Sequence, residues 1–275
     1  MLHSMKDIEN CTLGATDGFI GHVKDLYFDD EAWVIRYLIV ETGEWLSRRR
    51  VLISPFSLNQ PNWPEKILPA AITQDQVKHS PNIDTDKPVS RQHEIGYLGY
   101  YGYPYYWGGG SLWGGSLHPG AMLWGMDGAT TDEYRRTQAV NARTANEASD
   151  EHDDPHLRSG NAVLKYHVHS TDGDIGHVQG LLIDEKTWSI RYMIVNTSNW
   201  WFGHDVLIAP EWISDMNWAA SKVTVDLTRQ AVKGSPAYDS AKILNRDEET
   251  DIYKHYARDA YWPREAKHES SGPTP

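Results

Sequence analysis

Apolar and polar positions near the N-terminus follow the order expected for short β-strands. The turn dipeptide Asp17-Gly18 leads into a predicted strand over residues 20–28, and the polar residues 29–31 predict a loop. Residues 33–40 then offer eight consecutive positions that suit a pleated strand. Because successive side chains point to opposite faces and both sets are partly apolar, both faces should be covered. This pattern favours a small closed or nearly closed barrel.

Three further elements follow this pair of strands. Residues 51–53 predict a short strand, and another is expected near residues 66–72. The corresponding strand in the C-terminal half is clearer, at residues 222–227. Thr73 and Thr228 come directly after these last strands and are placed to cap short helices. About five strands and one helical turn therefore make up each half.

The pattern occurs twice, at a constant offset of 155 positions. Residues 16–107 and 171–262 share 35 identities in 92 aligned positions, without insertion or deletion. Such a spacing exceeds the roughly 20–50 residues of a solenoid repeat, so two tandem domains are predicted. The expected organisation is a lead-in at 1–12, a first barrel at 13–84, a helical turn with a Gly/Tyr/Trp-rich segment at 85–126, an acidic linker at 127–163, a second barrel at 164–239, and a helix, aromatic motif and disordered tail at 240–275.

Three motifs of the repeat resemble the PRC-barrel family. They read Thr-Asp-Gly-x-Ile-Gly-His-Val, Trp-x-Ile-Arg-Tyr-x-Ile-Val and Val-Leu-Ile-x-Pro, and the resemblance covers residues 13–84 and 168–239. It implies a mainly β fold of two tandem PRC-type barrels, each followed by a short helix and an aromatic tail, as in bacterial tandem proteins. The family also includes the cytoplasmic domain of the photosynthetic reaction-centre H subunit and the C-terminal domain of a ribosome-maturation factor.

Composition narrows the compartment and the partners. The net charge of −12 opposes direct nucleic-acid binding, because that binding depends on a basic surface. The single cysteine, Cys11, excludes a disulfide framework and favours a reducing, cytoplasmic compartment. A signal-peptide core and the roughly 18 apolar residues of a membrane span are both lacking, unlike the membrane-anchored H subunit. No cofactor is expected.

Three charged features leave alternatives. Arg48-Arg49-Arg50 has Gly203-His204-Asp205 as its counterpart, and predicts either a solvated loop or a docking point for an acidic partner. Residues 151–156 contain metal-ligand types, but nothing fixes their geometry, so a disordered linker is predicted in preference to a metal site. Arg36 and Arg191 are repeated in mid-strand and are each expected to pair with a carboxylate of the same barrel in preference to a ligand.

An Asp–His pair is the best catalytic candidate. Asp17 with His22, and Asp172 with His177, could in principle supply a base and the group that orients it. No nucleophilic Ser or Cys is shared near them, and an Asp in an Asp-Gly turn usually bonds backbone. The four residues are therefore predicted to be structural, and the protein is predicted not to be an enzyme.

Aromatic residues at equivalent positions are the main functional signal, because interfaces favour Tyr and Trp. The alternative is that the two barrels bury these side chains against each other. Each aromatic tail is expected to fold back and bury its tryptophan in an apolar groove. Residues 95–126 contain no Asp, Glu, Lys or Arg, and predict either an ordered strap or a flexible linker. The candidate interaction residues are Trp45, Trp200, Trp201, Tyr101, Tyr106, Trp107, Tyr256, Tyr261 and Trp262.

The leading functional prediction is a non-catalytic cytoplasmic adaptor that is pseudo-dimeric within one chain and binds a protein partner. Homo-oligomerisation is left open. One alternative is an electron-transport accessory of the reaction-centre type, which the H-subunit resemblance implies. Another is a factor associated with ribosomes or RNA processing that contacts a ribosomal protein. An enzyme is the least favoured class.

Overall fold

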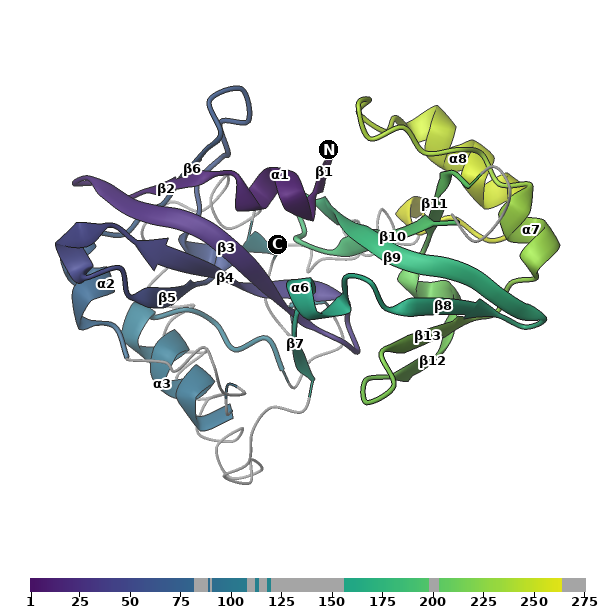
Figure 1. Ribbon diagram of the computed structural model, residues 1–275. Helices are drawn as coiled ribbons and strands as arrows, with labels where there is room; N and C mark the ends of the chain where they lie inside the picture. The colour runs from purple at the N-terminus through teal and green to yellow at the C-terminus, as the bar shows by residue number, and fades with distance from the viewer. Residues whose placement is uncertain are drawn as a thin grey trace, which may run out of the picture. The chain divides into compact units, whose positions relative to one another are not determined.

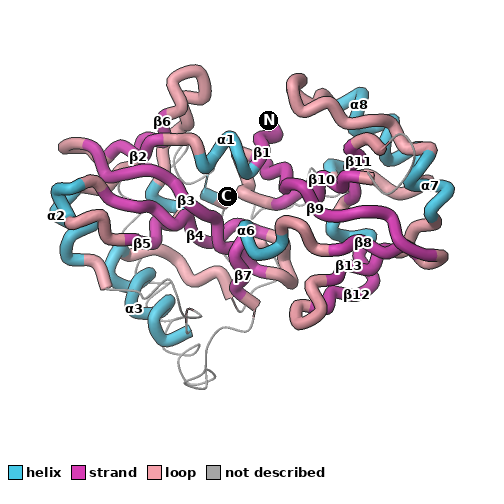
Figure 2. Tube along the Cα trace, viewed as in Figure 1, coloured by secondary structure: helices cyan, strands magenta, loops and turns pink. Residues whose placement is uncertain are grey.

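The computed structural model describes residues 1–81, 89, 91–107, 112–113, 118–119, 156–197 and 203–263. These residues fall into two compact units. The first comprises Met1, residues from His3 to Ala162, and Leu181–Arg191; the second comprises Leu2, Val163–Gly180 and the chain from Tyr192 onward. Strands make up most of the regular structure and the helices are short (Figures 1 and 2).

One sheet has six strands and mixed direction. Its order is β5-β4-β3-β2-β6, and β7 pairs with β3 outside this path. The β2–β6 pair is parallel, whereas the other pairs are antiparallel. The strands are β2 (Thr12–Gly14), β3 (Phe19–Asp29), β4 (Val34–Thr42), β5 (Arg50–Ile53), β6 (Ile67–Pro69) and β7 (Leu157–Ser159).

The other sheet has seven strands and repeats this arrangement. Its order is β11-β10-β9-β8-β13-β12, and β1 pairs with β9 outside this path. The β13–β8 pair is parallel, as the β2–β6 pair is in the six-stranded sheet. The strands are β1 (Leu2–Ser4), β8 (His167–Ser170), β9 (Gly173–Asp184), β10 (Ile190–Asn196), β11 (Asp205–Ile208), β12 (Ile213–Asn217) and β13 (Lys222–Val225).

The closed barrels that were expected are not present, because both sheets are open paths of the described strands. The segment between β5 and β6 explains this in the first sheet. Pro55 starts the 3-10 helix η2 (Pro55–Ser57) and ends the strand, and Pro61 and Pro64 supply no N–H groups. Isolated bridges, Leu58 to Ala70 and Asn62 to Ile67, join this segment to β6 and to the residue after it, in place of a continuous ladder. The fold is therefore mainly β with two mixed sheets.

The β3–β4 hairpin forms the centre of the first core. Residues 34–40 are all buried, so both faces of β4 are covered as predicted. Gly21 makes the close approach between the two strands possible, since a Cβ atom there would lie 2.0 Å from the carbonyl oxygen of Glu41. Gly176 repeats this feature, with a distance of 1.9 Å to the carbonyl oxygen of Asn196. These approaches explain why each motif has glycine before its histidine.

The turn that leads into β4 is built around Asp29. Its Oδ1 accepts the N–H groups of Glu31 and Ala32 at 3.0 and 2.9 Å, and Trp33 adopts a left-handed φ of 53°. The equivalent turn repeats this geometry, with Asp184 as the acceptor and Trp188 at φ 57°. The two tryptophans therefore close the turns and precede strands that begin at Val34 and Ile190, whereas the predicted strand at 33–40 included Trp33.

Within the first unit, the two equivalent turns bond to each other. Val34 forms an antiparallel bridge with Ser189, which is its own counterpart at the 155-residue offset. Ile35 N–H donates to Trp188 O at 2.8 Å, and Ile190 N–H donates to Trp33 O at 2.7 Å. The pairing is thus reciprocal: each turn donates one of these bonds and accepts the other, through equivalent residues.

The repeat begins earlier than the sequence comparison indicated. Strands β1 and β7 lie 155 positions apart, and the helices α1 (Met5–Glu9) and α6 (Gly160–Val163) follow them directly. Residues 1–12, expected as a plain lead-in, thus carry a strand and a helix. The acidic linker was expected to reach residue 163, but β7 and α6 are ordered, and Arg158 Nε bonds Asp30 Oδ2 at 2.9 Å. The preceding residues 127–155 lie outside the described part.

The remaining helices confirm the capping prediction. Thr73 caps α2 (Gln74–His79) by accepting the N–H of Gln76, and Thr228 caps α7 (Arg229–Lys233) in the same way. The helical turn expected before the first aromatic run is an eleven-residue helix, α3 (Arg91–Tyr101), that contains part of that run. Its equivalent is α8 (Arg246–His255). The other 3-10 helices are η1 (Glu44–Leu46) and η3 (Pro210–Trp212).

Candidate functional site

A fully buried glutamate joins helix α3 to the sheet of the first unit. Glu94 is 0% exposed, and its Oε1 accepts hydrogen bonds from Tyr37 Oη of β4, at 2.7 Å, and from Tyr106 Oη of the aromatic tail. Its Oε2 lies 3.1 Å from Arg91 Nη1. The carboxylate thus holds a strand, a helix and a tail together, and we call this group the Glu94 anchor.

Guanidinium groups cover the aromatic rings of the Glu94 anchor. Arg91 lies 4.2 Å from the centre of the Trp107 ring and 5.5 Å from that of Tyr106. Arg36 lies 3.9 Å from the Tyr106 ring and 4.8 Å from the ring of Trp113, which is buried. Cation–π attraction of this kind is stronger where water is excluded, so these contacts reinforce the packing of the tail.

The second unit contains the same arrangement, the Glu249 anchor. Glu249 Oε1 accepts from Tyr192 Oη at 2.9 Å and from Tyr261 Oη at 3.0 Å. Arg246 Nη1 lies 2.9 Å from Glu249 Oε2, and its guanidinium lies 4.3 Å from the Trp262 ring. Every one of these residues is the counterpart of a Glu94-anchor residue at the 155-residue offset.

The electrostatics of both anchors favour hydrogen bonding over proton exchange. Burial, followed by the nearby Glu94 charge, raises the pKa of Tyr37 well above its usual value. Burial and Glu249 act in the same way on the pKa of Tyr192. These hydroxyls therefore stay protonated and donate to the carboxylates at any physiological pH. The anchors fix the tails to the sheets.

The candidate tail residues divide into buried tyrosines and partly exposed tryptophans. Tyr106, Tyr256 and Tyr261 are buried, and burial raises the pKa of Tyr256 to about 12. Trp107 and Trp262 are only half-buried. Each tail packs on its own sheet, but the expectation that it buries its tryptophan is wrong, since the tyrosine hydroxyl reaches the glutamate. Tyr101 is half-buried and stacks on Tyr103 with ring centres 5.4 Å apart.

Trp45 lies in the loop between β4 and β5, beside an exposed phenylalanine. Its Nε1 donates to Ile20 O at 3.0 Å. A Cβ atom on Gly43 would lie 3.1 Å from Trp45 Cδ1 and 3.3 Å from Phe19 Cε1, so both rings lie against this glycine. Phe19 also makes an edge contact with His22, with ring centres 5.3 Å apart. The corresponding Trp200 and Trp201 lie outside the described residues.

The predicted basic loop continues from Trp45. Arg48 is exposed and pairs with Glu44 at 2.9 Å, while Arg49 Nη2 donates to Val77 O at 3.3 Å. Ser47 and Arg48 both have left-handed φ values, 53° and 54°. Left-handed backbone is unfavourable for residues with a Cβ atom, so this loop holds local strain.

In each Asp–His candidate pair, the aspartate accepts a backbone N–H group and the histidine lies in a strand. Asp17 Oδ1 accepts the N–H of Gln74, the first residue of α2, at 2.8 Å. Asp172 Oδ1 accepts the N–H of Arg229, the first residue of α7, at 2.7 Å, and this bond lowers the pKa of Asp172. His22 faces Thr12 across the β2–β3 pair, and His177 is paired with His167 in the β8–β9 ladder.

Arg36 pairs with a carboxylate, as predicted. Its Nη2 lies 3.0 Å from Asp29 Oδ2, and its Nη1 donates to Leu112 O at 2.7 Å. Burial alone would raise the pKa of Asp29, but Arg36 and neighbouring N–H groups outweigh it and hold that pKa below its usual value. In the second unit, Arg191 Nη2 donates to the Thr187 hydroxyl at 3.1 Å.

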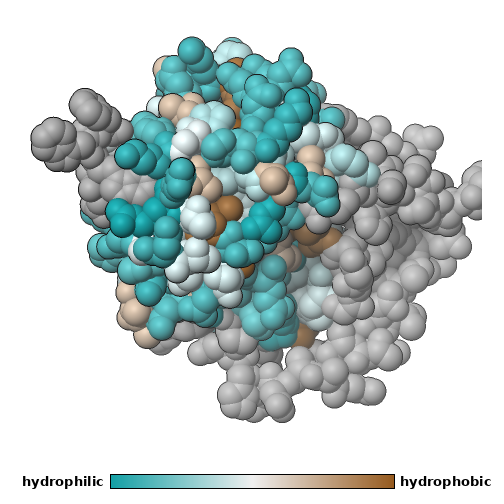
Figure 3. Space-filling view, turned by 90° about the vertical axis from the view of Figure 1, so that its right-hand side faces the viewer, coloured by the Kyte–Doolittle hydropathy of each residue, from teal (hydrophilic) through white to brown (hydrophobic). Residues whose placement is uncertain are grey.

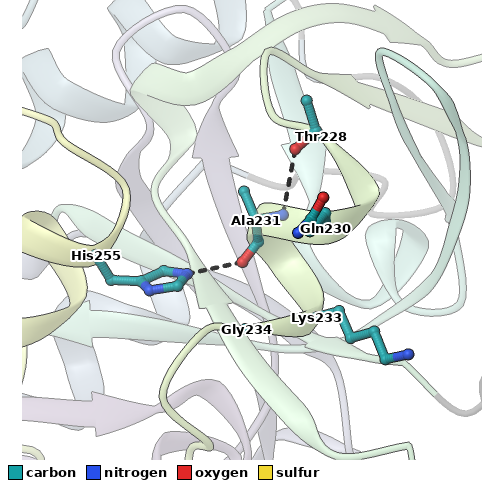
Figure 4. A pocket seen from close by; sticks show the side chains of 6 residues that line it. All are labelled: Thr228, Gln230, Ala231, Lys233, Gly234 and His255. Atoms are coloured by element: carbon teal, nitrogen blue, oxygen red, sulfur yellow. Dashed lines mark hydrogen bonds between the residues drawn. The ribbon is translucent and has the colours of Figure 1, made fainter.

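An open pocket of about 600 Å³ lies beside α7 in the second unit (Figure 4). Its lining consists of Thr228, which was predicted only as a helix cap, and of Gln230, Ala231, Lys233, Gly234 and His255. His255 Nε2 is 2.7 Å from Ala231 O, which leaves the imidazole engaged with the backbone. In Figure 3, which faces the side where α7 and α8 lie in Figure 1, hydrophilic side chains predominate on the described surface.

Among the described residues, no group of three or more His, Cys, Asp or Glu side chains is placed to hold a metal ion. No helix of the described part is long and apolar enough to cross a membrane. Most of the Glu- and Asp-rich stretch at 151–156 lies outside this part, from which only His156 is described.

The first copies of the three sequence motifs lie in the turn before β3 and in β3, β4 and β5. A protein-family model matches this region. Residues 4–64 match the model of the PRC-barrel domain. No curated protein matches the chain at a significant level. The PRC-barrel segment includes Tyr37 and the Trp45 loop, whereas Glu94 and the aromatic tail lie beyond it.

Sequence analysis missed the glutamate anchors although their signal was present. Tyr37, Arg91 and Glu94 are each identical to their counterparts at the 155-residue offset. Identical charged residues beside an aromatic helix are uncommon in a segment of otherwise divergent sequence. Attention to that coincidence would have indicated a buried polar network, because buried charges need partners.

Proposed function

We propose that this protein is a non-catalytic adaptor built from two tandem PRC-barrel modules, pseudo-dimeric within one cytoplasmic chain, that binds a protein partner. The observation that carries this proposal is the duplicated glutamate anchor. In both units the same strand, helix and tail are joined by one glutamate, one arginine and two tyrosines. Two modules with a common framework are the expected basis of a scaffold that presents two different surfaces.

The groups best suited to catalysis in each module are used for architecture. Asp17 and Asp172 accept backbone N–H groups at the helix starts, and Glu94 and Glu249 accept tyrosine hydroxyls. The loops, in contrast, differ between the modules in charge and in aromatic content. The reciprocal bonds between Trp33–Ile35 and Trp188–Ile190 support the pseudo-dimeric part of the proposal.

A capture experiment with the whole chain tests the adaptor function. The tagged protein is cross-linked in extracts of its native host, and enriched proteins are compared with those on an unrelated bait of equal charge. We expect a partner that the Phe19→Ser variant loses, because Phe19 is an exposed apolar side chain. Ile243→Ser, which alters another exposed apolar residue, is the matched control and should retain the partner. Enrichment of no protein over the unrelated bait contradicts the adaptor function.

A further inference from the structure

We infer that Phe19 and the loop 43–50 form a docking site for an acidic protein segment that carries an aromatic or aliphatic side chain. This inference rests on the proposed adaptor function and assigns its surface and the chemistry of its partner. Three features of the first unit support it: an apolar part, a cationic part and a preformed loop.

The apolar part consists of rings gathered around Gly43. Phe19 is 39% exposed, and its ring lies against Gly43 together with that of Trp45. The Trp45 indole N–H is bonded to Ile20 O, which fixes the ring in place. His22 also makes an edge contact with the Phe19 ring. Aromatic side chains that are partly exposed and already fixed lose little conformational entropy on binding, so they favour recognition of an apolar side chain.

The cationic part lies next to these rings. Arg48 N–H donates to Gly43 O at 3.2 Å, which places the start of the arginine run beside the aromatic rings. The Arg48 side chain is 70% exposed and that of its partner Glu44 is 85% exposed, so this ion pair contributes little stability. A carboxylate of a partner can therefore replace Glu44 at small cost. Arg50, the next exposed arginine, lies across from Glu41 in the β4–β5 ladder.

The loop is held in an unfavourable conformation by its own hydrogen bonds. Ser47 and Arg48 are consecutive residues with left-handed φ. The Thr42 hydroxyl donates to Arg49 O at 2.9 Å, and Leu46 N–H donates to Gly43 O at 3.2 Å. Strained backbone that the surrounding bonds maintain is typical of binding sites, where it presents side chains in the bound geometry.

The second repeat provides a comparison that favours a specific site. The counterpart of Phe19 is Asp174, and the arginines correspond to Gly203-His204-Asp205. A general requirement of the fold would recur in both copies, as the glutamate anchors do. A protein segment is favoured over nucleic acid because the site joins aromatic and cationic side chains, whereas the net charge of −12 opposes the many phosphate contacts on which nucleic-acid binding depends.

A labelled peptide tests the site directly. The probe is a fluorescent twelve-residue peptide of Asp and Glu with a central Phe-Leu pair, and its anisotropy is followed as the full chain is added. We expect saturable binding that weakens with salt, on the order of tenfold weaker binding for Arg48→Glu, and a several-fold loss for Phe19→Ser. Lys186→Glu introduces the same charge change at an exposed position of the 181–191 hairpin and should bind like the parent.

Three outcomes overturn the inference. The first is equal loss of binding in Arg48→Glu and Lys186→Glu, which indicates attraction to overall charge alone. The second is tighter binding of a single-stranded oligonucleotide of equal length, which assigns the loop to nucleic acid. The third is no binding of the peptide by a correctly folded parent. If a partner is still captured from the extract in that case, the adaptor function holds and only this surface is wrong.

Discussion

The two glutamate anchors are alike in their bonds but differ in their access to water. Arg91 of the first anchor is 19% exposed, whereas Arg246 of the second is 52% exposed. In the first anchor, Arg36 also lies over the Tyr106 ring and near the ring of Trp113, whose Nε1 donates to Thr187 O at 2.9 Å. The two anchors therefore have equivalent hydrogen bonds, but the first is less exposed to water than the second. Because water weakens electrostatic attraction, the same glutamate should contribute more stability in the first unit than in the second.

Removing each glutamate is the strongest test of this comparison. Glu94→Ala leaves Arg91 and two tyrosine hydroxyls without their common partner, and should lower the free energy of unfolding by about 3–5 kcal/mol. Glu249→Ala should cost roughly 2–3 kcal/mol, because water can reach Arg246. Urea unfolding followed by tryptophan fluorescence measures both losses. Glu94→Gln keeps an acceptor and should lose less than Glu94→Ala; equal losses in the two alanine variants contradict the comparison.

The glycines before the histidines should respond alike in the two units, since their surroundings match. Gly21→Ala and Gly176→Ala each place a methyl group within 2.0 Å of a carbonyl oxygen. Each change should cost roughly 1–3 kcal/mol by forcing the paired strands apart. Thermal unfolding measures the effect. Gly96→Ala is the control, because its methyl group meets no atom within 4 Å and alanine favours helix α3 by about 0.5–1 kcal/mol.

The two tail tryptophans make smaller contributions than their tyrosine neighbours. Trp107→Ala and Trp262→Ala each remove a half-buried ring and a guanidinium contact near 4 Å. We expect each change to cost about 1–2 kcal/mol, below the value for a buried tryptophan. Calorimetric midpoints compare them with Tyr106→Ala and Tyr261→Ala, which should lose more. A tryptophan variant that loses more than its tyrosine partner shows that the tryptophan is the principal contact.

The Arg36–Asp29 pair should give the smallest effect, as a pH dependence confined to the first unit. The pKa of Asp29 is lowered in the folded protein, so its contribution is complete above the unfolded value of about 3.9. That contribution is lost as the pH falls through the folded pKa. The stability gap between the parent and Asp29→Asn should therefore narrow below about pH 4 in urea titrations. Asp251→Asn, at an exposed carboxylate, controls for the lost charge; a gap that widens in acid has the opposite sign and contradicts this assignment.

The regular strands and caps were predictable because their signals are local. The run at 33–40 and the caps Thr73 and Thr228 each depend on neighbours within a few residues. Closure of a barrel is not local, since it depends on how the proline-containing segment after β5 returns to β6. The eleven residues of α3 include Gly96 and Gly99, which weaken a helix signal, and tertiary packing overrides them.

The candidate site was harder to predict because its partners lie far apart in the chain. Glu94 meets Tyr37 across 57 positions, and no local pattern indicates that contact. The aromatic content of the tails alone did not indicate which of their rings is buried. The tail tyrosines are buried because their hydroxyls reach a carboxylate. The neighbouring tryptophans lie against guanidinium groups and are only half-buried. The loop at 43–50 was detected as basic, but its approach to Phe19 depends on the fold of the hairpin.

The reciprocal pairing of Val34 with Ser189 bears on how this protein can diverge. In a dimer of identical chains, a residue on the two-fold axis faces itself, so every substitution there changes both sides at once. Here the two facing positions are encoded separately, and they already differ in size and polarity. One side can acquire a change while the other keeps its shape, and linkage in a single chain maintains a high effective concentration of the two segments. A substitution that would cause a steric clash on both sides of a symmetric dimer can therefore be tolerated here, because it changes only one of the two facing residues.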